Sequence, residues 1–228
     1  MNAVTLESRY DTHLRNFMMN MFNHVAGGIA VSGIVAWAVS MMPSVLYAIH
    51  GTAFKWVVMF APLAFIFWFS MNMKNMSLST IKAGYYAFTA FMGLALSYIF
   101  VAYTGESITS VFLVTTCTYL ASSLYGYTTK RDLTGMGSFL FMGLIGIIIA
   151  SIVNIFLQNS EFQFIISIIG VLVFTGLTAW DVQNAKNIFN DAPNMVEGER
   201  YGVMAAFGLY LNFINLFQML LHLLGNRE

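Results

Sequence analysis

Long runs of apolar residues, separated by short polar stretches, occupy most of this 228-residue chain. A helix needs about 20 apolar residues to cross the ~30 Å hydrocarbon core of a membrane. Seven runs meet this requirement: residues 23–42, 55–73, 83–103, 107–128, 136–157, 162–182 and 203–224. The pattern predicts an all-α membrane protein with seven transmembrane helices. The loops leave no room for a soluble domain, so we expect residues 1–228 to form one monomeric transmembrane bundle.

The composition supports a polytopic membrane protein. Hydrophobic residues make up 58% of the chain, charged residues make up 9%, and the mean hydropathy is +0.72. An ordinary soluble domain carries about 25% charged residues. The formal net charge is zero, which gives no support for nucleic-acid binding. The lipid bilayer is therefore the first partner that we expect.

The basic residues predict the orientation of the chain, because loops rich in Lys and Arg stay on the cytoplasmic side. One face of the predicted bundle holds Arg9, Arg15, Lys74, Lys82, Lys130, Arg131, Lys186 and Arg200. The other face holds only Lys55 and Arg227. We therefore expect a cytoplasmic N-terminus and an outside C-terminus. Residues 1–22 form a polar cytoplasmic segment, and the run after them begins too far along the chain for a cleaved signal peptide.

Asp181 is the carboxylate that lies within an otherwise apolar predicted span. A charge in such a place is costly, and it often lines a polar path or binds a ligand. A second reading needs no function. Within about two turns of the cytoplasmic interface, the carboxylate can reach water or Lys186.

Polar residues on the last two spans recur at helical spacing. The last span carries a stripe of Ala205, Gly208, Asn212, Asn215, Met219 and His222. The preceding span carries Phe174, Leu177, Thr178, Asp181 and Ala185 on one face. Residues three and four apart share a helix face, so we expect the two stripes to face each other as a pore lining or a packing surface.

Counting residues does not by itself place Asp181 next to Asn212. If Lys186 and Arg200 mark the interface, Asp181 lies about 7 Å deep and Asn212 about 18 Å deep. Asn212 and Asn215 could equally form interhelical hydrogen bonds, each worth about 0.6 kcal/mol. A similar stripe on span 107–128, with Thr115, Tyr119, Ser122 and Gly126, indicates tight helix packing.

Three segments resemble motifs of the Bax inhibitor-1 family, bacterial branch. They are Leu-Tyr-Leu-Asn-Phe-Ile-Asn-Leu-Phe at 209–217, Ala-Trp-Asp-Val-Gln at 179–183 and Tyr-Gly-Tyr-Thr-Thr-Lys-Arg-Asp-Leu at 125–133. The resemblance covers essentially the whole chain. It implies a bacterial inner-membrane protein with seven helices, in which two aspartates on helices six and seven sense protons and close a calcium-permeable pore.

Carried onto this sequence, the resemblance assigns the first aspartate to Asp181 and places the second at Asn212. The family also uses an arginine on helix two as a latch, but span 55–73 has no basic residue after Lys55. Lys74 and Lys82 are the nearest latch candidates. An Asp–Asn pair lacks the repulsion between two carboxylates, so we expect weaker pH gating and one fewer anionic ligand for calcium.

Two function classes follow from these observations. The first is a pH-sensitive calcium or cation leak controlled by Asp181 and Asn212, with Thr178, Gly208 and Asn215 along the path. The second is a regulator that transports nothing and binds a membrane-bound quality-control protease or another membrane partner. No cofactor is expected apart from calcium as the transported or bound ion, with Asp181 as its candidate ligand.

Catalysis is not expected. A retinal protein needs a Schiff-base lysine in its last helix, and span 203–224 has none. A serine protease needs a serine activated by a histidine inside the bundle, but only His24 and His222 fall near apolar runs. A zinc hydrolase would need several inward-facing histidines or acids, and the predicted spans lack such a set.

Overall fold

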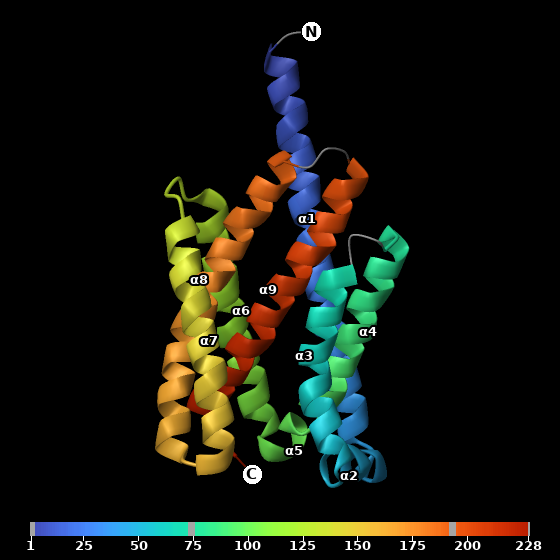
Figure 1. The fold of residues 1–228 in the computed structure, drawn as a ribbon, viewed down its shortest axis with the longest axis vertical. Helices are drawn as coiled ribbons and strands as arrows, with labels where there is room; N and C mark the ends of the chain where they lie inside the picture. The colour runs from blue at the N-terminus through green and yellow to red at the C-terminus, as the bar shows by residue number, and fades with distance from the viewer. Residues whose placement is uncertain (1–2, 73–75, 192–194, 228) are drawn as a thin grey trace. The chain divides into compact units, whose positions relative to one another are not determined.

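The computed structural model describes residues 3–72, 76–191 and 195–227. This part of the chain forms nine helices (Figure 1): α1 Ala3–Ser40, α2 Pro43–His50, α3 Phe54–Asn72, α4 Leu78–Leu96, α5 Ile99–Ala102, α6 Gly105–Thr128, α7 Thr134–Leu157, α8 Ser160–Asp191 and α9 Met195–Leu224. The predicted all-α class is confirmed.

Six described helical stretches are long and apolar enough to cross a membrane: Thr12–Ser40, Leu78–Ala102, Gly105–Thr128, Thr134–Leu157, Ser160–Asn190 and Glu197–Leu224. A seventh span is possible if α2 and α3 act together, although a bend of 72° separates them. The six to seven candidate spans agree with the seven predicted from hydropathy.

The first helix is longer than its apolar run. The α1 helix begins at Ala3, so most of the predicted polar segment 1–22 continues the same helix. The candidate span within α1 begins at Thr12, eleven residues before the start predicted from hydropathy alone.

Residue contacts divide the chain into two compact units. The first contains Met1–Tyr103 and Ala192–Phe207, and in its described part α1 and α3 both pack against α4. Its core contains stacked aromatic rings: Phe88 lies 5.0 Å from Phe65 and 4.7 Å from Phe207 between ring centroids. The prediction of a single bundle stays a prediction.

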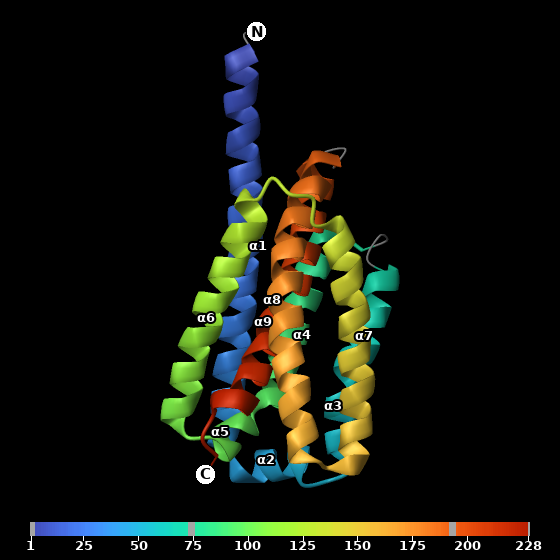
Figure 2. The same ribbon diagram turned by 90° about the vertical axis from the view of Figure 1, so that its left-hand side faces the viewer.

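The second unit contains Thr104–Asp191 and Gly208–Arg227. Helix α8 packs against both α6 and α7 and lies between them in Figure 2. Small residues permit this packing, because a Cβ atom at Gly126 would collide with the Ala179 carbonyl and one at Gly137 with the Trp180 indole. This unit holds the residues of the candidate site.

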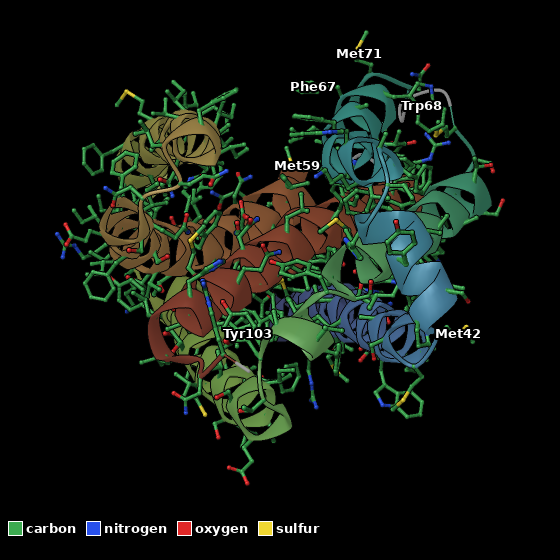
Figure 3. The ribbon with its side chains drawn as sticks, turned by 90° about the horizontal axis from the view of Figure 1, so that it is seen from below. Met42, Met59, Phe67, Trp68, Met71 and Tyr103 are labelled. Carbon is green, nitrogen blue, oxygen red and sulfur yellow. The ribbon has the colours of Figure 1, made fainter. Side chains whose placement is uncertain are left out.

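Large apolar side chains remain exposed on the outer faces of both units. On α3, Met59, Phe67, Trp68 and Met71 are exposed, and Phe67 and Met71 point away from α4 (Figure 3). On α7, Phe156 is 82% exposed. In water such surfaces would be unfavourable, but they are consistent with helices that contact lipid.

Candidate functional site

Asp181 and Asn212 meet within the second unit. The Asn212 amide Nδ2 donates a hydrogen bond of 2.7 Å to Asp181 Oδ2. Asn212 is 7% exposed, and Asp181 is half-buried. The bond joins α8 to α9, so the two polar stripes face each other at this level.

The observed helix ends explain why depths counted from Lys186 and Arg200 did not place Asp181 next to Asn212. Lys186 and Arg200 end neither helix: α8 continues to Asp191 and α9 begins at Met195. The stretch between the predicted spans 162–182 and 203–224 is therefore largely helical in its described part. Depths counted from these two residues do not measure depths from a common surface.

The other residues of the predicted stripes contribute differently. Thr178 is fully buried, and its hydroxyl donates to the Phe174 carbonyl of its own helix at 2.8 Å. Asn215 Nδ2 likewise donates within its helix, to the Leu211 carbonyl at 2.8 Å. A Cβ atom at Gly208 would lie 3.5 Å from Asp181 Oδ2. Gly208 is therefore close to Asp181, while the observed bonds of Thr178 and Asn215 do not join helices.

The latch candidates lie elsewhere. Lys74 is outside the described residues. Lys82 belongs to the first unit and forms an ion pair of 3.6 Å with Glu199, in which both side chains are substantially exposed. The observed partner of Lys82 is thus Glu199 of the same unit.

Lys186 does not neutralise Asp181 in the described structure. Its ammonium group donates to the Tyr127 carbonyl at 2.7 Å and lies 4.9 Å from the centroid of the Tyr127 ring. No ion pair joins it to Asp181 among the described side chains. Lys186 is therefore not the observed partner of Asp181. This removes one part of the interpretation in which Asp181 has no function.

Hydrogen bonds join two of the sequence motifs, the one at 179–183 and the one at 125–133. Gln183 Oε1 accepts a hydrogen bond from the Leu133 N–H at 2.8 Å, and Gln183 Nε2 donates to the Arg131 carbonyl at 2.8 Å. Together with Lys186, these bonds hold the link between α6 and α7 against α8. The motif around Asp181 therefore combines an intramembrane acid with an anchor for this link.

The same link contains an acid whose environment favours the charged form. Asp132 Oδ1 accepts a hydrogen bond of 2.9 Å from the Thr134 N–H at the start of α7. Hydrogen bonds from the Thr134 hydroxyl and N–H lower the pKa of Asp132 below its ordinary value. Asp132 therefore stabilises the helix start as a carboxylate.

Tyr119 of α6 is a neighbour of this site that the sequence indicated only as a packing residue. Its ring meets Phe213 of α9 in an edge-to-face contact with centroids 5.4 Å apart, and Phe213 directly follows Asn212. The three-and-four spacing of Thr115, Tyr119 and Ser122 could have indicated that a hydroxyl turns inward. Hydropathy alone gave no reason to connect it with Asp181.

The site is one carboxylate with neutral polar neighbours. Among the described residues, no group of three or more His, Cys, Asp or Glu side chains could hold a metal ion. Asp181 can take up one proton or supply one anionic oxygen ligand. Apolar helices long enough to cross a membrane, two of them joined by this carboxylate–amide pair, define a polytopic membrane protein.

Comparison with known proteins identifies the family. The sequence model described as inhibitor of apoptosis-promoting Bax1 matches residues 14–228. The chain therefore belongs to the Bax inhibitor-1 family, as its motifs indicated, and this family is not known as one of enzymes.

Several bacterial relatives match nearly end to end. The chain is similar to inner membrane protein YbhL of Escherichia coli K12, with 39% identity over 218 residues that cover 94% of this chain and 93% of YbhL. It is 42% identical to the uncharacterized protein RP147 of Rickettsia prowazekii, covering 96% and 93%. An uncharacterized protein of Caulobacter vibrioides is 43% identical, covering 96% and 92%. The chain is a multi-pass protein of the bacterial inner membrane.

Proposed function

We propose that this protein is a pH-sensitive cation leak channel, with calcium as the ion, in which the contact between Asp181 and Asn212 closes the path. The observation that carries the proposal is the 2.7 Å hydrogen bond between the two side chains, one on α8 and one on α9. Opening the path would break this bond and separate the two residues.

The position of Asp181 supports this role. The other carboxylates of the described candidate spans lie within five residues of the start of their helix: Glu106, Glu161, Glu197 and Glu199. Asp181 lies in the interior of α8, more than twenty residues after its start and ten residues before its end. A carboxylate deep in a spanning helix is costly and is commonly part of an ion or proton pathway.

The chemistry of the pair supports control by protons. A hydrogen bond to a charged acceptor is roughly twice as strong as one to a neutral acceptor. Protonation of Asp181 would therefore weaken the bond from Asn212, and cation flux should rise as pH falls. Whenever the contact is open and Asp181 is ionised again, its carboxylate can serve as an oxygen ligand of the kind that calcium prefers.

Asn212 sets the strength of the pH response. Two neighbouring carboxylates share protons because they cannot both ionise freely. Asn212 is an amide and carries no charge, so a single group titrates at this contact. We infer a weaker pH dependence than a pair of aspartates would give.

Calcium flux into proteoliposomes, measured across a pH series, tests the proposal. Asp181→Asn should abolish the pH dependence of flux, and Asn212→Asp should shift the pH profile by restoring a second carboxylate. Asp132→Asn, in the link between α6 and α7, is the matched control and should leave the profile unchanged. The pairing idea is wrong if neither Asp181→Asn nor Asn212→Asp moves the profile.

The same experiment addresses the second function class. If purified protein gives no flux in any variant, and a membrane protease co-purifies with the native chain, the protein acts as a regulator of that protease. Flux without any added protein excludes the need for such a partner.

A further inference from the structure

Two buried hydroxyl groups on α6 make no hydrogen bond to any described residue. They belong to Tyr119, which is 3% exposed, and Ser123, which is 4% exposed. Ser123 lies one helical turn beyond Tyr119, on the same face of α6. Buried polar groups of this kind are rare in folded proteins.

A third such hydroxyl, that of Thr175, projects from α8. It too is buried without a hydrogen-bonding partner among the described residues. The packing of Gly126 against Ala179 sets the level at which α6 meets α8. About one turn back along each helix, roughly 5 Å, lie Ser123 on α6 and Thr175 on α8. The two residues come at a similar level because α6 and α8 run in the same direction (Figure 2).

We define Tyr119, Ser123 and Thr175 as the hydroxyl trio, and Tyr119 connects the trio with the Asp181 site. The Tyr119 ring packs on Phe213, the residue after the Asp181 partner Asn212. Helix α6 thus brings Tyr119 to the α9 residue that follows Asn212, while Ser123 and Thr175 lie near the level at which Gly126 meets Ala179.

Other charged groups do not provide partners for the trio. Helix α7 contributes no charged residue over Thr134–Leu157, and α9 beyond Gly208 contributes only His222, whose ring bonds the Gln218 carbonyl. Helix α6 contributes Glu106 at its start, far along the helix from Tyr119. On α8, Glu161 lies in the first turn and Lys186 bonds the Tyr127 carbonyl. The link between α6 and α7 adds Lys130, Arg131 and Asp132, which are exposed.

We propose that the hydroxyls of Tyr119, Ser123 and Thr175 bind internal water beside Asp181, and that this water delivers protons to the Asp181 carboxylate. Buried water typically makes about three hydrogen bonds to polar groups that would otherwise lack a partner, and three hydroxyls supply that number. Leaving all three without partners would be costly, whereas bridging water removes the cost.

The proton transfer is simple in this arrangement. A hydronium ion held by the trio transfers one proton to a carboxylate oxygen of Asp181, leaving a neutral water and a neutral carboxylic acid. The three hydroxyls stay neutral and orient the water. They are positioning residues, and this step rests on the proposed role of Asp181 as the proton-sensitive group.

Infrared spectroscopy of the purified chain in lipid nanodiscs tests the inference without any flux measurement. The carbonyl band of protonated Asp181 is identified by its loss in Asp181→Asn, and its shift after transfer to D2O reports how fast water reaches the group. In the native protein we expect a fast exchange phase. In the triple variant Tyr119→Phe, Ser123→Ala and Thr175→Val that fast phase should be lost.

Thr115→Val is the matched control. Thr115 is fully buried on α6, but its hydroxyl donates to the Val111 carbonyl of its own helix at 2.7 Å. This variant should keep the fast exchange phase. Exchange in the triple variant as fast as in the native protein would overturn the inference, whatever the flux experiments show.

Thermal unfolding of the single variants gives a second readout if the triple variant does not fold. Replacing a hydroxyl that holds water should lower the unfolding midpoint, because the water and its remaining partners lose a bond. Replacing a hydroxyl that has no partner should leave the midpoint unchanged or raise it. A raised or unchanged midpoint in Tyr119→Phe and in Ser123→Ala would contradict bound water.

Discussion

At the scale of single residues, Asp181 is held in an apolar span by one neighbouring amide, that of Asn212. The spacing of polar residues predicted that these two stripes face each other, because the helical repeat fixes which residues share a face. It could not predict which members meet, since that depends on where each helix ends and how it inclines. The bond of Lys186 to the Tyr127 carbonyl was also beyond prediction, because no spacing rule links residues so far apart in sequence.

Asp132 gives a prediction about pH at the same scale. Its folded-state pKa lies below the ordinary value of 3.8 because Thr134 donates hydrogen bonds to its carboxylate. The charged form therefore stabilises the fold above that value, and the contribution is lost as pH falls through the folded-state pKa. Thermal unfolding in detergent should show native protein losing stability relative to Asp132→Asn as pH drops from about 6 to about 3. An unchanged difference between the two proteins would contradict this role.

At the scale of helices, the packing of α6 on α8 depends on the absence of a side chain at Gly126. A Cβ atom there would collide with the Ala179 carbonyl, which is backbone and cannot rotate away. We therefore expect Gly126→Ala to destabilise the fold by about 1–3 kcal/mol, the usual cost of overpacking, measured as a lower midpoint of thermal unfolding.

Gly146 is the matched glycine for this prediction. A Cβ atom at Gly146 would have no neighbour within 4 Å, and alanine favours helix by about 1 kcal/mol over glycine. Gly146→Ala should therefore leave the unfolding midpoint unchanged or raise it. If the two alanine variants lose the same stability, close packing at Gly126 is not the cause.

The helices themselves were predictable, while their ends were not. Hydropathy located every described candidate span, because crossing a membrane demands a run of apolar residues. It ended α8 too early and began α9 too late, since α8 continues through polar residues to Asp191 and α9 already begins at Met195. The 72° bend between α2 and α3 was missed as well, because a short helix before a turn leaves little trace in hydropathy.

At the scale of the whole molecule, the distribution of Lys and Arg predicts a cytoplasmic link between α6 and α7 and an outside link between α7 and α8. Both links offer exposed positions, Lys130 and Asn159. In a Cys117→Ser background, a membrane-impermeant thiol reagent added to intact spheroplasts should label Asn159→Cys and spare Lys130→Cys. Permeabilised spheroplasts should label both. The reverse pattern in intact spheroplasts would show that the orientation is inverted.

The closing role of the contact between Asp181 and Asn212 is the central claim. Calcium flux into proteoliposomes at neutral pH tests it most directly, with Asn212→Leu compared with Asn215→Leu. Asn212 donates across to α8, whereas Asn215 donates within its own helix, so only the first substitution removes the bond between helices. The account predicts that Asn212→Leu raises the flux at neutral pH above that of the native protein, while Asn215→Leu does not. Native-like flux in Asn212→Leu protein that folds and inserts normally would contradict it.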